Sequence, residues 1–313
     1  MTKVFVDGSA GTTGLRIRER LQDRPDLEVI ALSEELRKDP EARREAINSA
    51  DAAILCLPDA AAEEAVSLID PDNGRVAVID TSTAHRTAEG WTYGFPELFG
   101  GAQREKIRRS KRIANPGCHA SGFIALVSPL REAGILGPDA HLTAYSLTGY
   151  SGGGKKMIAE YEAPDRDPLF DAPRMYGLGQ AHKHLPEMQA VCGLTAAPAF
   201  CPVVAPFYAG MEVTVALFSD EIDGDAAKIA EVYRSCYKTG SGAVRFAETA
   251  GENGFLSAGA FAGRDDMEIA VFGNEERIVL AARFDNLGKG ASGAAVQNLN
   301  LILGADELSG LAV

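Results

Sequence analysis

Several features are missing from this 313-residue sequence, and each absence narrows the class of protein. The five cysteines are scattered and form no CxxC pair, which argues against a disulfide framework and a zinc knuckle. No apolar run approaches the ~20 residues of a membrane-spanning helix, and no basic segment followed by an apolar one opens the chain. Together these absences predict a protein of the reducing cytoplasm that has no membrane partner.

Positive charge is also scarce, because 31 Lys and Arg face 44 Asp and Glu, for a formal net charge of −13. A polyanion such as nucleic acid is therefore not an expected partner. The basic run over residues 104–112 is interpreted as a solvated surface. With 46% hydrophobic residues and this length, the chain is expected to form two globular domains.

Apolar strands alternate with helical segments through the first third of the chain, which predicts a parallel sheet covered on both faces. This is the Rossmann architecture, in which ligands bind beyond the carboxyl ends of the strands. In the first helix, Leu15 and Leu21 are expected to face the core. The expected strands are residues 3–7, 27–32, 52–57 and 76–80, and the expected helices are residues 11–22, 34–48 and 60–69.

The pattern changes after Cys118. Residues 211–218 alternate polar and apolar side chains, as a half-buried antiparallel strand does. Residues 268–272 and 277–284 form a second strand pair, joined at Gly273 and Asn274. We therefore expect a catalytic and oligomerisation domain of the α+β class, with a mixed or antiparallel sheet. The expected domain limits are residues 1–117 with the helical tail 290–313 for the Rossmann domain, and residues 118–289 for the second.

The turn that follows the first strand reads GSAGTTG and opens the first helix. Glycines let the backbone approach a pyrophosphate, and the helix N-terminus offers N–H groups and a partial positive charge. The spacing is GxxGxxG rather than GxGxxG, so the support comes from the order strand, turn, helix. At the end of the second strand, Ser33 with nearby Arg37 and Lys38 suits a 2′-phosphate, whereas Glu34 suits a free ribose. The residues leave NADP and NAD both open.

A cysteine begins a second helix in the segment NPGC, which follows a short strand at residues 112–114. The N–H groups and dipole at a helix N-terminus favour thiolate over thiol, so Cys118 is the candidate nucleophile. The same N–H groups, with the amide of Asn115, are candidates to stabilise an oxyanion beside the sulfur. Cys56, within an apolar strand, is interpreted as an inert buried residue.

The segment HKHLPE supplies His182, His184 and Glu187. A thiolate nucleophile needs a neighbouring acid or base, and histidine titrates near neutrality. Two histidines and a carboxylate are an incomplete zinc set without a further ligand at suitable spacing, so no metal is expected. Two further segments are candidates for ligand contacts: Arg86 follows a parallel strand, where it suits a carboxylate or phosphate, and the glycine loop 149–155 resembles an anion-binding nest.

Taken together, these motifs resemble the N-acetyl-γ-glutamyl-phosphate reductase family of arginine biosynthesis, in its shorter form. The likeness covers essentially the whole chain, and the motifs occur in the order of the family. The segments that carry it are GSAGTTG, IDTSTAHR, NPGCHASG, HKHLPE and DNLGKGASGAAVQNLNLILG.

The resemblance implies roles for individual residues. Cys118 would be the nucleophile and His182 the acid/base. The substrate would be bound or oriented by Arg86, Asn115, Ser151, His184 and Glu187. NADP would be bound by Gly8, Gly11, Thr12, Thr13, Gly14, Ser33, Asn286 and Lys289. The family uses NADP, which decides between the two cofactors that the residues left open.

The resemblance also implies a reaction. The Cys118 thiolate would attack the γ-acyl phosphate of N-acetyl-L-glutamyl 5-phosphate and expel phosphate, leaving a thioester. Hydride from NADPH and a proton handled by His182 would then give N-acetyl-L-glutamate 5-semialdehyde. The alternatives are the same chemistry on aspartyl or aminoadipyl phosphate, a non-catalytic dinucleotide-binding protein, and a zinc protein. A homo-oligomer, dimer or tetramer, is expected as in the family.

Overall fold

The computed structural model describes residues 1–238 and 242–313, which separate into two compact units. No helix within these stretches is both long enough and apolar enough to cross a membrane. Unit 1 comprises Met1–Pro96, Gln103–Pro116 and Ala291–Leu311, and unit 2 comprises Glu97–Ala102, Gly117–Gly290 and Ala312–Val313.

The sheet of unit 1 is parallel throughout its described strands, in the order β2-β1-β3-β4-β6-β5. Its inner strands are buried on both faces, as the continuous apolar runs predicted. The predicted Rossmann architecture is confirmed. The strands are β1 (Thr2–Asp7), β2 (Leu27–Ile30), β3 (Ala52–Leu55), β4 (Ala77–Asp80), β5 (Thr92–Tyr93) and β6 (Arg112–Ala114).

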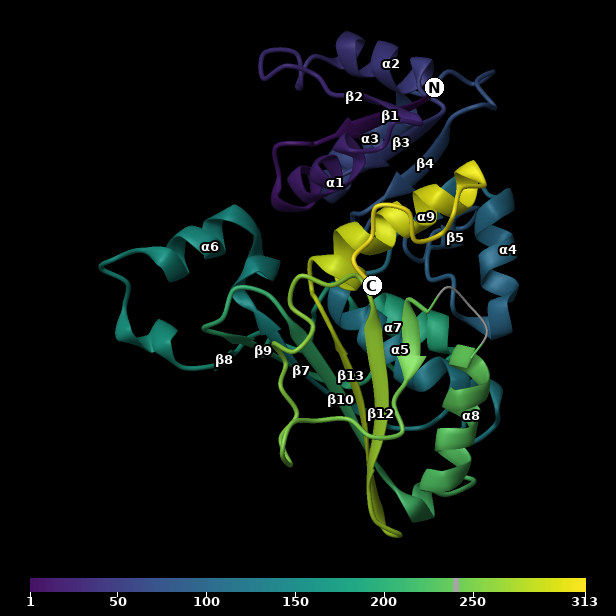
Figure 1. The fold of residues 1–313 in the computed structure, drawn as a ribbon, viewed down its shortest axis with the longest axis vertical. Helices are drawn as coiled ribbons and strands as arrows, with labels where there is room; N and C mark the ends of the chain where they lie inside the picture. The colour runs from purple at the N-terminus through teal and green to yellow at the C-terminus, as the bar shows by residue number, and fades with distance from the viewer. Residues whose placement is uncertain (239–241) are drawn as a thin grey trace. The chain divides into compact units, whose positions relative to one another are not determined.

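Helices cover both faces of this sheet (Figure 1). Side chains of α1 (Thr12–Gln22), α4 (Ala102–Arg109) and α9 (Gly293–Leu303) share one apolar core with Val4, Ile54 and their neighbours. On the other face, α2 (Pro40–Ser49) and α3 (Asp59–Ser67) pack against Phe5, Ala53 and Leu55. The final helix therefore completes the core of the unit with which the chain begins.

Two local predictions for unit 1 were wrong. Leu15 is 47% exposed, whereas Leu21 is buried, because Ile17 and Leu21 define the inner stripe of α1 and Leu15 lies two residues outside it. The helix expected over residues 34–48 begins only at Pro40. Proline suits the first turn but disfavours helix in the residue before it, and the Asp39 side chain caps the start by accepting from the Ala42 N–H.

Unit 2 contains a mixed sheet in the order β11-β12-β13-β10-β7-β9-β8 among its described strands. The β7–β9 and β11–β12 pairs are parallel, and the others are antiparallel. The predicted antiparallel pair at the β12–β13 hairpin is confirmed. The strands are β7 (Thr143–Gly149), β8 (Arg174–Met175), β9 (Ala199–Ala205), β10 (Met211–Phe218), β11 (Val244–Phe246), β12 (Met267–Gly273) and β13 (Arg277–Phe284).

One face of this sheet carries helices. α5 (Cys118–Glu132) packs on β10 and β13, and α8 (Ala226–Lys238) packs on β11 and β12. α7 (Leu185–Cys192) packs against α5, whereas α6 (Gly154–Glu162) belongs to an excursion beyond the β8 edge (Figure 1). Inward side chains of β10, such as Val213 and Val215, are fully buried and alternate with outward ones. The face opposite α5 is therefore left without a described helix.

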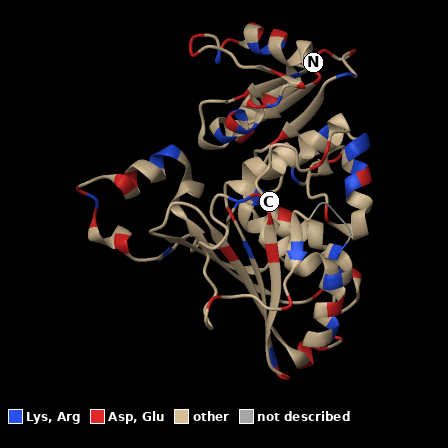
Figure 2. Cartoon of the chain, viewed as in Figure 1, with Lys and Arg blue, Asp and Glu red and all other residues tan. Residues whose placement is uncertain are grey.

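The basic run of residues 104–112 falls largely on α4, where blue and red segments adjoin (Figure 2). Arg104 pairs with Glu307 at 2.8 Å and Arg108 pairs with Glu105 at 2.6 Å, while Ile107 points into the core. The run is thus one outer face of an amphipathic helix with local acidic partners, which agrees with its interpretation as a surface.

Candidate active site

A pocket of about 320 Å³ opens in unit 2 where α5 begins. Its wall brings together side chains from α5 and from the loop of residues 176–184, which joins β8 to α7. Gly149, the last residue of β7, and Gly152 and Gly153, which follow the strand, also line it. The chemically active side chains on the wall are Cys118, His119, Tyr176, His182, Lys183 and His184.

Cys118 is the first residue of α5, and Gly117 precedes it as the N-cap with extended backbone angles. The sulfur therefore belongs to the helix turn whose N–H groups have no intrahelical acceptor, which favours a negative charge there. Cys118 packs closely against the backbone of Gly290. A Cβ added to that glycine would lie only 2.9 Å from the Cβ of Cys118, so a larger residue would not fit there. Sequence and structure agree that Cys118 begins a helix and lies on a pocket wall.

Three other cysteines show the contrast. Burial raises the pKa of the Cys56 thiol to about 12 and that of Cys236 to about 11, and it also raises the pKa of Cys192. These groups stay protonated near neutrality and cannot serve as thiolate nucleophiles. Cys56 nevertheless lies on the wall of a different pocket and is half-buried rather than sealed in the core.

Glu187 lies in the first turn of α7 and is almost fully buried. Its Oε2 accepts a hydrogen bond from the N–H of Gly117 at 3.2 Å. The carboxylate thereby positions the backbone residue immediately before Cys118. Glu187 thus contacts the backbone next to Cys118, and its contact with substrate stays a prediction.

The two histidines of HKHLPE lie edge to face, with ring centroids 4.7 Å apart. The backbone N–H of His184 donates to Nδ1 of His182 at 3.2 Å. A nitrogen that accepts a hydrogen bond carries no proton, so His182, when it is neutral, has its proton on Nε2. His182 is consequently arranged to offer an N–H donor, and both rings line the pocket with Cys118.

Sequence reasoning did not assign a role to His119 or to Tyr176. His119 is buried, with Nδ1 2.7 Å from the Ser146 hydroxyl and Nε2 2.7 Å from the Tyr176 hydroxyl. Burial, with a smaller contribution from His182, lowers the pKa of His119 to about 3, so this ring is neutral. The only available signals were the position of His119 next to the cysteine and that of Tyr176 six residues before His182.

Ser151 and Asn286 are brought together, although neither lines this pocket. Asn286 donates from Nδ2 to the Ser151 Oγ at 3.0 Å and accepts at Oδ1 from the Gly210 N–H at 3.0 Å. Lys289 is fully buried and pairs with Glu97 at 2.8 Å. All of these contacts lie inside unit 2 and tie its loops together, so cofactor or substrate contacts by Ser151, Asn286 and Lys289 stay predictions.

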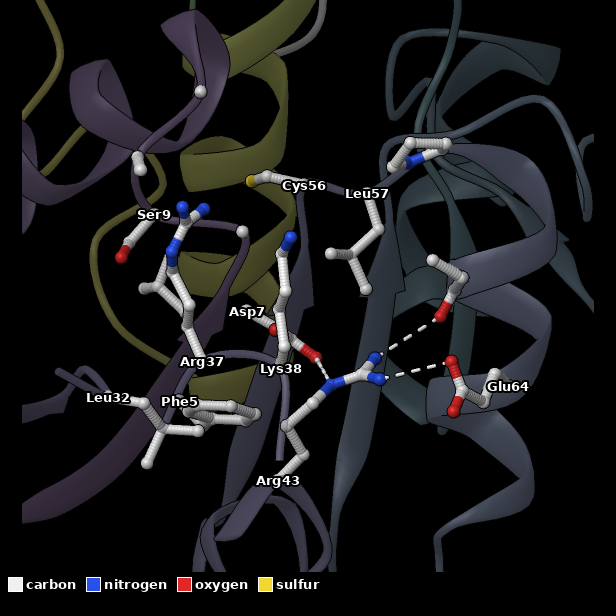
Figure 3. A pocket seen from close by; sticks show the side chains of 16 residues that line it. Phe5, Asp7, Ser9, Leu32, Arg37, Lys38, Arg43, Cys56, Leu57 and Glu64 are labelled. Carbon is white, nitrogen blue, oxygen red and sulfur yellow. Dashed lines mark hydrogen bonds and ion pairs between the residues drawn. The ribbon is translucent and has the colours of Figure 1, made fainter. Parts of the chain in front are cut away.

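A second pocket, of about 410 Å³, lies in unit 1 beside the glycine turn (Figure 3). Gly8 has a φ of +79°, and a Cβ there would lie 2.3 Å from the carbonyl oxygen of Cys56. A Cβ at Gly14 would lie 2.6 Å from the Gly8 oxygen, so both positions require glycine to fold. Gly11 has an ordinary φ of −75°, and its nearest neighbour would be 3.5 Å away. The fold does not require glycine at that position.

Gly8 and Gly11 line this pocket, and Thr12, Thr13 and Gly14 form the first turn of α1 directly behind it. A first helical turn leaves N–H groups without intrahelical acceptors, which is the usual feature of a phosphate site. Of the residues weighed for the cofactor preference, Arg37 and Lys38 line the pocket, whereas Ser33 and Glu34 do not. The Glu34 carboxylate instead pairs with Arg37 at 2.8 Å.

The floor of the pocket holds an ion-pair cluster that the sequence did not reveal (Figure 3). Arg43 from α2 donates to Asp7 at 3.0 Å and to Glu64 at 3.2 Å. Asp7 ends β1 and is buried, and that burial raises the pKa of its carboxyl although Arg43 opposes the shift. The cluster joins β1, α2 and α3 beneath the glycine turn.

Arg86 and Asn115 both lie in unit 1, at the carboxyl ends of its strands. Arg86 donates from Nε to the carbonyl of Asn115 at 3.0 Å and from a terminal nitrogen to that of Thr81 at 3.1 Å. The Asn115 amide donates to the Ala291 carbonyl and accepts from Asn298, each at 3.1 Å. These bonds fasten the amide to the final helix, so its part in stabilising an oxyanion stays a prediction.

No group of three or more His, Cys, Asp or Glu side chains suited to a metal ion occurs among residues 1–238 and 242–313. The histidine pair of HKHLPE therefore does not belong to such a group in the described chain.

Comparison with known proteins places this arrangement among related enzymes. Residues 118–286 match the model of the family described as "Semialdehyde dehydrogenase, dimerisation domain". The chain is 45% identical to N-acetyl-gamma-glutamyl-phosphate reductase 2 of Pseudomonas putida, with 98% of each chain covered. It is 46% identical to N-acetyl-gamma-glutamyl-phosphate reductase of Brucella canis, covering 96% of this chain and 99% of that one.

Solved structures share the fold at much lower identity. The aspartate semialdehyde dehydrogenase II of Vibrio cholerae aligns with a TM-score of 0.70 at 18% identity, over 96% of this chain and 98% of that one. The aspartate semialdehyde dehydrogenase of Candida albicans, solved with NADP, aligns with a TM-score of 0.68 at 15% identity, over 98% and 99% of the two chains. These likenesses establish the shared fold.

Proposed function

Because the chain belongs to the N-acetyl-gamma-glutamyl-phosphate reductase family, we propose that it reduces N-acetyl-L-glutamyl 5-phosphate to N-acetyl-L-glutamate 5-semialdehyde and phosphate, with NADPH, in arginine biosynthesis. The observation that carries the proposal is the position of Cys118. It begins a helix on the wall of a pocket that also holds three histidines, His119, His182 and His184. An acyl phosphate reduced through a covalent intermediate needs this combination of nucleophile and proton donor.

In the first step the thiolate of Cys118 attacks the acyl carbon and the bond from carbon to the phosphate oxygen breaks, which leaves a thioester and releases phosphate. The thioester is more readily reduced than a carboxylate would be. In the second step hydride adds to the thioester carbon, and the resulting thiohemiacetal oxyanion expels the sulfur as thiolate and leaves the aldehyde. The overall reaction takes up one proton, which leaves with the phosphate.

His182 is suited to stabilise charge on the carbonyl oxygen in both steps. Its Nδ1 accepts from the His184 backbone, so the donor that we assign to the oxyanion is the Nε2–H of the neutral ring. Glu187 acts one residue away from the sulfur by holding the Gly117 N–H. We propose that this bond fixes the turn from which Cys118 projects, which makes Glu187 a positioning residue.

The unit 1 pocket has the features that a nicotinamide dinucleotide requires. NADPH bound there would supply the hydride. Gly11 supports this assignment, because glycine is not needed for the local fold and its missing side chain leaves room for the approach of a pyrophosphate. Arg37 and Lys38 line the pocket and support the 2′-phosphate of NADP over the free ribose of NAD, whereas Glu34, which would suit the ribose, does not line it.

The open face of the unit 2 sheet supports a homo-oligomer. Tyr145, Phe218 and Val279 are exposed by 44%, 51% and 37% on the neighbouring strands β7, β10 and β13. In register, Val279 lies opposite Ala216, Tyr145 opposite Thr214 and Phe218 opposite Arg277, so exposed apolar side chains alternate with polar ones on this face. We propose that two copies pair through this face, since the matched family model is a dimerisation domain. Phe218→Glu is then expected to shift the mass measured by light scattering towards the monomer.

We also propose that the protein works in the cytoplasm, because its cysteines are free thiols in the described structure.

The substrate is tested by assaying the purified protein with N-acetylglutamyl, aspartyl and aminoadipyl phosphates in the presence of NADPH. The proposal expects kcat/KM to be highest for the first. A higher value for aspartyl or aminoadipyl phosphate would assign the alternative semialdehyde chemistry, and no NADPH oxidation with any of them would overturn the enzymatic proposal.

A further inference from the structure

A buried hydrogen-bond chain runs from the sheet to the wall of the Cys118 pocket. Ser146 on β7 is fully buried and lies 2.7 Å from His119 Nδ1, and His119 Nε2 lies 2.7 Å from the Tyr176 hydroxyl. The Tyr176 ring is also close to the ring of His182, with centroids 5.9 Å apart. The chain thus joins the interior of unit 2 to the pocket.

The direction of the protons along this chain follows from the buried end. In residues 1–238 and 242–313, the hydroxyl of Ser146 has His119 Nδ1 as its one hydrogen-bond partner. A buried hydroxyl proton without an acceptor is unfavourable, so Ser146 donates and Nδ1 accepts. The neutral His119 ring then carries its proton on Nε2 and donates it to the Tyr176 oxygen.

The phenolic proton of Tyr176 is therefore not directed at His119. Within the described chain the Tyr176 hydroxyl has no other hydrogen-bond partner, and the pocket that it lines also holds Cys118 and His182. Burial, followed by the charge of Cys118, raises the pKa of Tyr176 above its ordinary value, so the hydroxyl keeps its proton near neutrality. The phenolic proton of Tyr176 therefore points into the pocket.

We propose that Tyr176 is a catalytic hydrogen-bond donor whose proton is aimed by the Ser146–His119 pair at the Cys118 sulfur, and at the carbonyl oxygen of an acyl group bound to that sulfur. This inference rests on the proposed acyl-transfer function and adds to it a second neutral donor beside His182. Ser146 and His119 are positioning residues, because they act through the tyrosine. No proton is consumed along the chain, since each group only orients the next.

The principal test is a double-mutant cycle on Tyr176→Phe and Ser146→Ala, assayed with N-acetylglutamyl phosphate and NADPH. Loss of one oxyanion donor lowers kcat by about a hundredfold, while KM stays within about threefold, because the bond is strongest in the transition state. Ser146→Ala frees His119 to accept from Tyr176 instead, so kcat falls by about five- to tenfold. In the Tyr176→Phe background, Ser146→Ala then has no further effect on kcat, because the proton that it aims is absent.

A second measurement needs neither substrate nor cofactor. The rate at which iodoacetamide alkylates Cys118 reports its thiolate, with Cys118→Ser as the blank for the other thiols. Removing a donor to the thiolate moves the midpoint of this pH profile upward by about half a unit or more in Tyr176→Phe. Tyr208→Phe is the matched control, because Tyr208 is exposed and lies outside the pocket.

The outcomes separate this inference from the proposed function. If the wild-type protein is inactive, the proposed function is wrong, and the alkylation profile still decides whether Tyr176 donates to the sulfur. If the wild type is active while Tyr176→Phe retains full kcat and an unshifted profile, the hydrogen-bond role is overturned. If Ser146→Ala lowers kcat equally in the wild-type and Tyr176→Phe backgrounds, Ser146 contributes only packing. That result would contradict the proposal that Ser146 orients the Tyr176 proton.

Discussion

The two pockets of this protein are built from different parts of the polypeptide. The unit 1 pocket is shaped by backbone, at a turn where Gly8 and Gly14 permit contacts that a Cβ would block. The unit 2 pocket is shaped largely by side chains that come from α5 and from the loop of residues 176–184 between β8 and α7. A pocket built from backbone suits a group that many ligands share, such as a pyrophosphate. A pocket built from particular side chains suits one chemical reaction.

This difference predicts that substitutions will affect the two pockets in different ways. Changes at the glycine turn should alter folding or cofactor affinity, because the backbone itself forms the site. Changes around Cys118 should alter turnover while leaving cofactor affinity intact.

The largest expected effect is that of Cys118→Ser. Serine lacks the ready ionisation and nucleophilicity of a thiolate, so kcat should fall by at least about a thousandfold. NADPH affinity, measured by fluorescence titration, should stay within about twofold of wild type. Unchanged turnover would falsify the thioester mechanism, and lost NADPH binding would break the separation of the two pockets.

Gly8→Ala should chiefly damage folding. The positive φ is strained for alanine and its Cβ would lie 2.3 Å from the Cys56 oxygen, so we expect a loss of about 3 kcal/mol in the free energy of unfolding. Urea denaturation followed by circular dichroism measures this loss. A variant as stable as wild type would show that the turn tolerates a different backbone path.

Acid should destabilise the folded protein through His119, which lines the unit 2 pocket. Its pKa is about 3 when folded and ordinarily 6.5, so between these values the unfolded chain binds a proton that the folded protein does not. The stability held above pH 6.5 is therefore lost as pH falls through this window, by about 2 kcal/mol from pH 7 to pH 5. Urea titrations at both pH values should show that His119→Gln loses less than wild type by this amount; identical losses would contradict the buried neutral ring.

The smallest expected effect is that of Gly11→Ala, which is also the matched control for Gly8→Ala. The added Cβ meets only ordinary contacts, so the free energy of unfolding should change by less than about 0.5 kcal/mol. Affinity for NADPH, measured by the same titration as above, should nevertheless fall about tenfold, because the methyl group occupies space beside the pyrophosphate. Retained affinity would remove Gly11 from the proposed cofactor site.

The sequence was most informative where a local rule determines the structure. The turn from β1 into α1, the alternating burial of β10, and the start of α5 at Cys118 all follow from short-range patterns, and the structure has them. The start of α2 at Pro40 could also have been predicted from the sequence. Asp39 and Pro40 form a helix-start signal, which outweighs the helix-favouring residues that precede them.

Contacts between segments that are distant in the sequence could not be predicted from it. Ser146, His119 and Tyr176 meet only because β7, α5 and the loop after β8 converge in unit 2, and no spacing in the chain encodes that meeting. The same is true of Arg43, whose position in a polar helix gave no sign of a buried pair with Asp7. Lys289 and Asn286 were selected as cofactor contacts, and the partners that the structure gives them depended on which loops fold against them.

The return of α9 to unit 1 has a consequence for biosynthesis on the ribosome. Val296 and Leu299 pack with Val4 and Ile54, yet they are translated after all of Gly117–Gly290. The rest of unit 1 must therefore wait, with an apolar face of its sheet uncovered, until Gly117–Gly290 and α9 have been made. Folding cannot finish in strict N-to-C order, and a nascent chain of this design has reason to depend on chaperones during that interval.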